Sequence, residues 1–238
     1  MSGPIQLPLV QVAAAPLRDD GWHRAARQTR LLAWASLVWM TLEGVIGAIA
    51  GLQADSISVL TWAASSAVEG MASVIVVWRF TGRRTSSETS ERRAQKWVGA
   101  SFFLLAPYFV YESIHRLVTG SDAQTTTLAV ALTASSVVLM PALGWAKLKL
   151  GRRLDSGATA GEGMQNLLCA GQALAALVAV LGAGRGLGLL DPIAALAIAG
   201  VAAKEGAGLW RGDQCACHTI PGLDAEPAAD RRADACCS

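Results

Sequence analysis

The sequence predicts an all-α protein, a bundle of six transmembrane helices with its N and C termini in the cytoplasm. Apolar residues make up 53% of the 238 residues and charged residues only 16%, whereas a soluble domain carries about a quarter charged residues. The apolar residues also form long continuous runs, and a spanning helix needs about 20 of them. Continuous runs favour helices over the alternating pattern of a transmembrane β-barrel.

Six runs are long enough to be spans. The sixth contains Asp191-Pro192 and ends near Lys204, whose long side chain can reach the membrane interface. The predicted spans are Leu31–Leu52, Ile57–Trp78, Trp97–Ile114, Thr125–Ala146, Gly163–Gly184 and Leu187–Ala203.

The basic residues define the orientation of these spans. Of the 20 Lys and Arg residues, all except Arg116 and Arg185 fall before the first span, after the second, after the fourth, or at the end of the sixth. In a six-span chain these positions share one side, and the positive-inside rule makes that side cytoplasmic. We therefore expect a multi-pass protein of the plasma (inner) membrane.

Composition divides the chain into three segments. Residues 1–27 are expected to be a cytoplasmic leader, because they lack the apolar core of a signal peptide. Residues 28–210 form the transmembrane domain. Residues 211–238 are too short and too polar to bury a core, and we expect a flexible, Cys-rich cytoplasmic tail with reduced thiols.

The second span contains a full carboxylate, Glu69, within the apolar stretch "LTWAASSAVEGMASVIVVW". A charge at the bilayer centre costs at least about 2.5 kcal/mol, so such a residue is a functional candidate. Ser65 lies four residues earlier on the same helix face. Gln165 and Cys169 repeat this spacing in the fifth span. Two such pairs on neighbouring helices can converge on a small cation with four donor atoms.

Each of these residues also has a structural interpretation. Glu69 can be a protonated side chain that is hydrogen-bonded to a neighbouring helix. Gln165 can join two helices through its amide, and Cys169 can be a small packing residue, as buried cysteines usually are.

Four segments in order carry a resemblance to a known family. They are "GLQADSISVL" before the second span, "SSAVE" within it, "EGMQNLLC" at the fifth and "DPIAALAIAG" at the sixth. Over about residues 30–210 the chain resembles the cation diffusion facilitators, which are proton-coupled exporters of zinc and related divalent metals. The segments "YES", "MPALGWAK" and "WRGDQC" resemble short members of this family, and the usual C-terminal cytoplasmic domain is expected to be absent.

The resemblance implies an intramembrane metal site with altered ligands. The family's D-x-x-x-D pair of the second span falls at Ser65 and Glu69, and its H-x-x-x-D pair of the fifth falls at Gln165 and Cys169. Glu69 alone keeps its ligand class. A thiolate at Cys169 would favour softer ions such as zinc, cadmium or copper(I) over hard divalent ions. The family's exchange of metal for protons would then involve Glu69 and Cys169.

The tail offers a second candidate metal site in "CACH" and "ACC". Its soft donors can chelate zinc or copper, although the spacing is not that of a C-x-x-C pair. An ordinary thiol-bearing tail is the alternative. The donors are Cys215, Cys217, His218, Cys236 and Cys237.

The sequence therefore predicts a transporter of divalent or soft heavy-metal cations, similar to zinc and cadmium exporters, that couples efflux to protons. It is expected to be no enzyme, to need no cofactor, to sit in the lipid bilayer and to bind no nucleic acid, and the family resemblance implies a homodimer. One alternative is a non-transporting metal sensor or accessory protein, which the replacements at Ser65 and Gln165 favour. A membrane redox enzyme is disfavoured, because C-x-x-C, a haem-ligating His pair and a nucleotide loop are missing. Transport requires Glu69 and Cys169 to face the same space.

Overall fold

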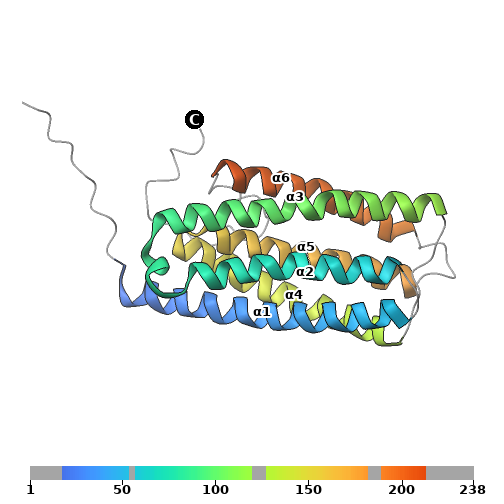
Figure 1. The fold of residues 1–238 in the computed structure, drawn as a ribbon, viewed down its shortest axis with the longest axis horizontal. Helices are drawn as coiled ribbons and strands as arrows, with labels where there is room; N and C mark the ends of the chain where they lie inside the picture. The colour runs from blue at the N-terminus through green and yellow to red at the C-terminus, as the bar shows by residue number, and fades with distance from the viewer. Residues whose placement is uncertain (1–17, 54–56, 120–126, 182–188, 213–238) are drawn as a thin grey trace, which may run out of the picture.

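The computed structural model describes residues 18–53, 57–119, 127–181 and 189–212, and within them the predicted all-α fold of six helices is confirmed (Figure 1). A short 3-10 helix, Gly82–Ser86, lies between the second and third long helices. The long helices are α1 (Asp20–Gln53), α2 (Ile57–Arg79), α3 (Glu88–Thr119), α4 (Thr127–Leu154), α5 (Gly157–Leu181) and α6 (Leu190–Arg211).

The helices pack as two groups. Helices α1, α2, α4 and α5 form a four-helix bundle in which α1 contacts α2 and α4, while α5 contacts α2 and α4. Helices α3 and α6 pack against each other and cover α2 and α5. Figure 1 shows that α1 begins and α6 ends at the same end of the molecule. We call this the terminal end, and we call the opposite end the far end.

The outer surface is apolar, as a bilayer requires. Among the described residues, four helices are long and apolar enough to cross a membrane: α1 over Asp20–Ala50, α3, α4 over Val130–Leu154, and α6. Large apolar side chains on α1 recur every three or four residues and stay half exposed, which is the pattern of a lipid-facing stripe. These side chains are Leu31, Trp34, Val38, Leu42, Val45, Ile49 and Leu52.

Glycines bring the helix backbones close together. A Cβ atom at Gly163 of α5 would lie 2.9 Å from the carbonyl oxygen of Gly144 on α4, and one at Gly99 of α3 would lie 3.2 Å from that of Gly206 on α6. In lipid, helices associate through such close contacts because burial of apolar surface supplies no driving force between them. Because the helix backbones lie this close, the polar side chains between them also lie close to one another.

Three helices, α1, α3 and α5, begin earlier than hydropathy predicted, and α5 begins at Gly157. Helix α1 begins at Asp20, so the expected leader of residues 1–27 ends inside it. The carboxylate of Asp19 accepts a hydrogen bond of 2.7 Å from the backbone N–H of Trp22, as an N-cap does. Helix α3 begins at Glu88, well before Trp97. Hydropathy marks only the part of a helix that contacts hydrocarbon, whereas backbone hydrogen bonding continues into the polar interface.

The predicted fourth span ends at Ala146, which leaves Lys147 in the loop that follows it. This prediction was wrong. Helix α4 continues to Leu154, and the side chain of Lys147 is fully buried within the bundle. Its neighbour Lys149 is exposed. The charge of Lys147 can be buried because a carboxylate on α5 faces it, and the sequence does not reveal that partner.

A second buried ion pair ties three helices at the terminal end. Arg79, at the end of α2, donates from Nε to Glu91 Oε2 of α3 over 2.7 Å, and the two side chains are only 4% and 9% exposed. The other oxygen of Glu91 accepts hydrogen bonds from Ser156 Oγ at 2.9 Å and from the N–H of Ala158 at 3.1 Å. Glu91 thus joins α2, α3 and the beginning of α5.

Candidate cation site

The structure brings together Glu69 and Cys169. Glu69 lies on α2 and Cys169 on α5, and the thiol lies close enough to the carboxylate to interact with it. Both side chains are half-buried between the two helices. A carboxylate and a thiol from two different helices therefore lie near each other in the interior of the bundle.

Ser65 and Gln165 use their polar groups toward α3. Ser65 is buried, and its hydroxyl is hydrogen-bonded to that of Tyr108. Gln165 is also buried, and its Nε2 donates a hydrogen bond of 2.7 Å to Ser101 Oγ. The amide of Gln165 thus joins α5 to α3. Its other atom, Oε1, is buried and has no hydrogen-bond partner among the described residues, so this oxygen is available to a ligand.

Glu43 of α1 was not among the predicted ligands but belongs to the same electrostatic environment. It is buried and accepts a hydrogen bond of 3.2 Å from Ser136 Oγ of α4. Its carboxylate is close enough to Glu69 and Cys169 to interact electrostatically with both. Glu43 is the only acidic residue in the first predicted span, and the cost of placing a carboxylate there is the signal that could have identified it.

These groups do not form a complete metal site in this state. In the part of the chain that the structure describes, no three His, Cys, Asp or Glu side chains lie close enough together to hold a metal ion. Glu69 and Cys169 are in contact, Glu43 acts at longer range, and Gln165 offers one neutral oxygen. A cation between α2 and α5 would have to draw these donors closer.

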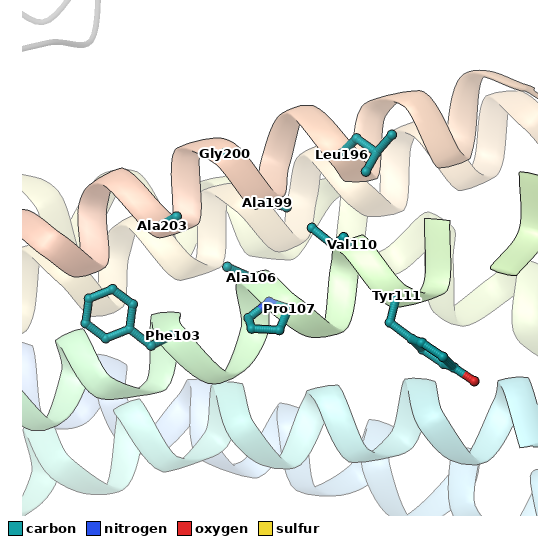
Figure 2. A pocket seen from close by; sticks show the side chains of 9 residues that line it. All are labelled: Phe103, Ala106, Pro107, Val110, Tyr111, Leu196, Ala199, Gly200 and Ala203. Carbon is teal, nitrogen blue, oxygen red and sulfur yellow. The ribbon is translucent and has the colours of Figure 1, made fainter. Parts of the chain in front are cut away.

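The bundle also carries a groove of about 630 Å³ between α3 and α6 (Figure 2). Its lining is apolar and includes Phe103, Pro107, Val110 and Leu196, while Gly200 leaves its wall open. Figure 2 shows the hydroxyl of Tyr111 pointing away from these side chains. The groove lacks donors for a metal, so it is separate from the candidate cation site.

The family model of the cation efflux transmembrane domain matches residues 33–211. The chain belongs to the cation efflux family. The match extends from α1 to the end of α6 and includes every residue of the candidate site on these helices. Among curated proteins, none matches the chain. The family assigns the protein to membrane transporters of metal cations.

The Asp-Pro motif of this cation efflux domain has a structural role at the far end. Asp191 lies in the first turn of α6 and pairs with Arg116 of α3 through a contact of 2.7 Å. Arg116 also pairs with Glu112 at 2.7 Å, and Gln172 of α5 donates to the other oxygen of Asp191 at 3.0 Å. Asp191 therefore joins α3, α5 and α6, and its oxygens are already occupied.

The tail candidates of this cation efflux protein lie outside the described residues. They are Cys215, Cys217, His218, Cys236 and Cys237. Within the described part, Cys169 is a free thiol, so the soft donor for which the structure gives a position is the one beside Glu69.

Proposed function

We propose that the protein exports zinc, cadmium or a similar soft divalent cation through a site centred on Glu69 and Cys169. The observation that carries the proposal is the proximity of the thiol and the carboxylate across α2 and α5. These two helices pack against each other in the interior of the bundle. An ion bound there would be shielded from lipid and reachable along the helix interface.

The donor atoms favour a soft or borderline ion. A thiolate selects zinc, cadmium or copper(I), whereas hard ions such as magnesium and manganese prefer all-oxygen sites. Glu69 supplies one anionic oxygen, and the unpartnered Oε1 of Gln165 can supply a neutral one. The buried carboxylate of Glu43 adds negative potential nearby. Together these groups can compensate for the missing charge at Ser65.

Proton exchange follows from the same contact. The Cys169 thiol lies beside the Glu69 carboxylate, and a metal binds the thiolate only after the thiol proton has left. Cation binding from one side should therefore release protons. Protons that enter from the other side should displace the cation, so that the two fluxes are opposed.

We place the protein in the plasma (inner) membrane, with the terminal end of the bundle on the cytoplasmic side. The support is the positive-inside rule, because basic side chains gather at this end. Examples on the exposed surface are Arg24 and Arg27 of α1, Arg92 and Arg93 of α3, and Arg152 of α4. The thiols of the tail would then face cytoplasmic metal and could deliver it to the site.

The experiment is metal flux in proteoliposomes with an imposed pH gradient. Zinc and cadmium uptake is measured for the unaltered protein, for Glu69→Gln and for Glu205→Gln, a matched control on a buried carboxylate of α6. We expect Glu69→Gln to abolish uptake and the control to retain it. Uptake that is independent of the pH gradient would refute proton coupling.

A sensor or accessory role is the second candidate. Its support is that Ser65 and Gln165 already bond to α3, as they would in a scaffold that has lost its ligands. If folded protein carries neither zinc nor cadmium under any gradient, this second function replaces the first.

A further inference from the structure

A buried ammonium group lies apart from the Glu69–Cys169 contact, between α1, α4 and α5. Lys147 is 0% exposed. Its Nζ donates to Glu162 Oε1 at 2.7 Å and to Asn166 Oδ1 at 3.2 Å, both on α5. It also donates to Ser36 Oγ of α1. Three oxygen atoms from two other helices thus surround one positive charge.

The cluster has an unused acceptor. Glu162 is 1% exposed, and its second oxygen, Oε2, has no hydrogen-bond partner among the described residues. A buried carboxylate oxygen without a partner is costly, and it belongs to the same carboxylate that pairs with Lys147. The cluster therefore holds more acceptor capacity than the ammonium group uses.

The composition of the cluster indicates which ion it fits. Oxygen donors suit hard cations, in contrast to the sulfur-containing pair at Cys169. The cluster contains a single carboxylate, Glu162, so one positive charge neutralises it. Lys147 provides this charge in the present structure. A monovalent ion preserves neutrality in its place, whereas a divalent ion leaves an excess charge in a dry interior.

We propose that Ser36, Glu162 and Asn166 form a second cation position, specific for a small monovalent cation such as Na⁺, in which the Lys147 ammonium is a tethered occupant. The inference goes beyond the proposed metal export, because it concerns other residues, a hard monovalent ion and a site that the chain itself fills. The unaltered protein then needs no free ion here. An ion from solution enters only when Lys147 withdraws.

The test replaces the tethered cation by one from solution. Lys147→Met keeps an unbranched side chain but removes the terminal nitrogen and its charge, and Lys149→Met is the matched control, an exposed residue on the same helix. Thermal unfolding of the purified full chain in detergent is followed in sodium chloride and in choline chloride of equal ionic strength. We expect sodium to raise the midpoint of Lys147→Met saturably by about 5 °C, and to leave the unaltered protein and the control unchanged. Adding Glu162→Gln to Lys147→Met should remove this response.

Three results would overturn the proposal. The first is an equal midpoint of Lys147→Met in sodium and in choline. The second is a Lys147→Met protein that folds in neither salt, although the double variant with Glu162→Gln folds. That result would mean that sodium cannot replace the ammonium group. The third is recovery of stability on acidification in choline with no added effect of sodium, which would show that a proton on Glu162 suffices. None of these readouts depends on zinc or cadmium flux.

Discussion

Replacing Glu91 by glutamine removes the charge that holds Arg79 at the terminal end of the bundle. Breaking one partner of a buried ion pair costs about 3–5 kcal/mol, because the other charge stays buried without compensation. Three hydrogen bonds reduce this cost. Arg79 also donates to the carbonyl oxygen of Arg84, and the glutamine oxygen can still accept from Ser156 and from Ala158. We therefore expect a loss of about 3 kcal/mol in the free energy of unfolding.

For a chain of this size, that loss corresponds to a decrease of roughly 6–12 °C in the unfolding midpoint. The assay is thermal unfolding in detergent, followed by the fraction of protein that remains monodisperse. Glu88→Gln is the matched control, because Glu88 lies in the same first turn of α3 and is exposed. If Glu91→Gln is no less stable than Glu88→Gln, the pair does not hold the helices together. A double-mutant cycle with Arg79→Gln that gives no coupling energy would refute the reasoning equally.

Two further predictions concern the site and the packing. Cys169→Ser keeps a hydrogen-bond donor beside Glu69 but removes the soft ligand. The preference for cadmium over manganese should therefore fall by about tenfold or more, which corresponds to about 1.4 kcal/mol. An unchanged ratio of cadmium to manganese flux would exclude Cys169 as a ligand. Gly163→Ala places a Cβ 2.9 Å from a carbonyl oxygen of α4 and should cost about 1–3 kcal/mol of stability, measured by thermal unfolding. Gly200→Ala, which meets nothing within 4 Å, is the control and should not destabilise the protein.

Part of the candidate site could be predicted from local spacing. Glu69 and Cys169 were paired because each lies on a span and the two spans were expected to be neighbours, and the structure places their side chains in contact. The partners of Ser65 and Gln165 could not be predicted in the same way. Both bond to α3, and the rotation of α3 about its own axis decides which of its polar groups face inward. That rotation follows from packing against α2, α5 and α6 rather than from any local pattern.

The sequence by itself determined the helical class, the approximate spans and the carboxylate of Glu69 as a residue of interest, because the preference for lipid depends on the composition of each segment alone. Only the tertiary structure decided that Lys147 is an interior residue paired with Glu162, and that Glu43 lies near Glu69. The two residues of each pair lie on different helices. Their contacts depend on the register and rotation of packed helices, which are set by close glycine contacts such as that of Gly163 with Gly144.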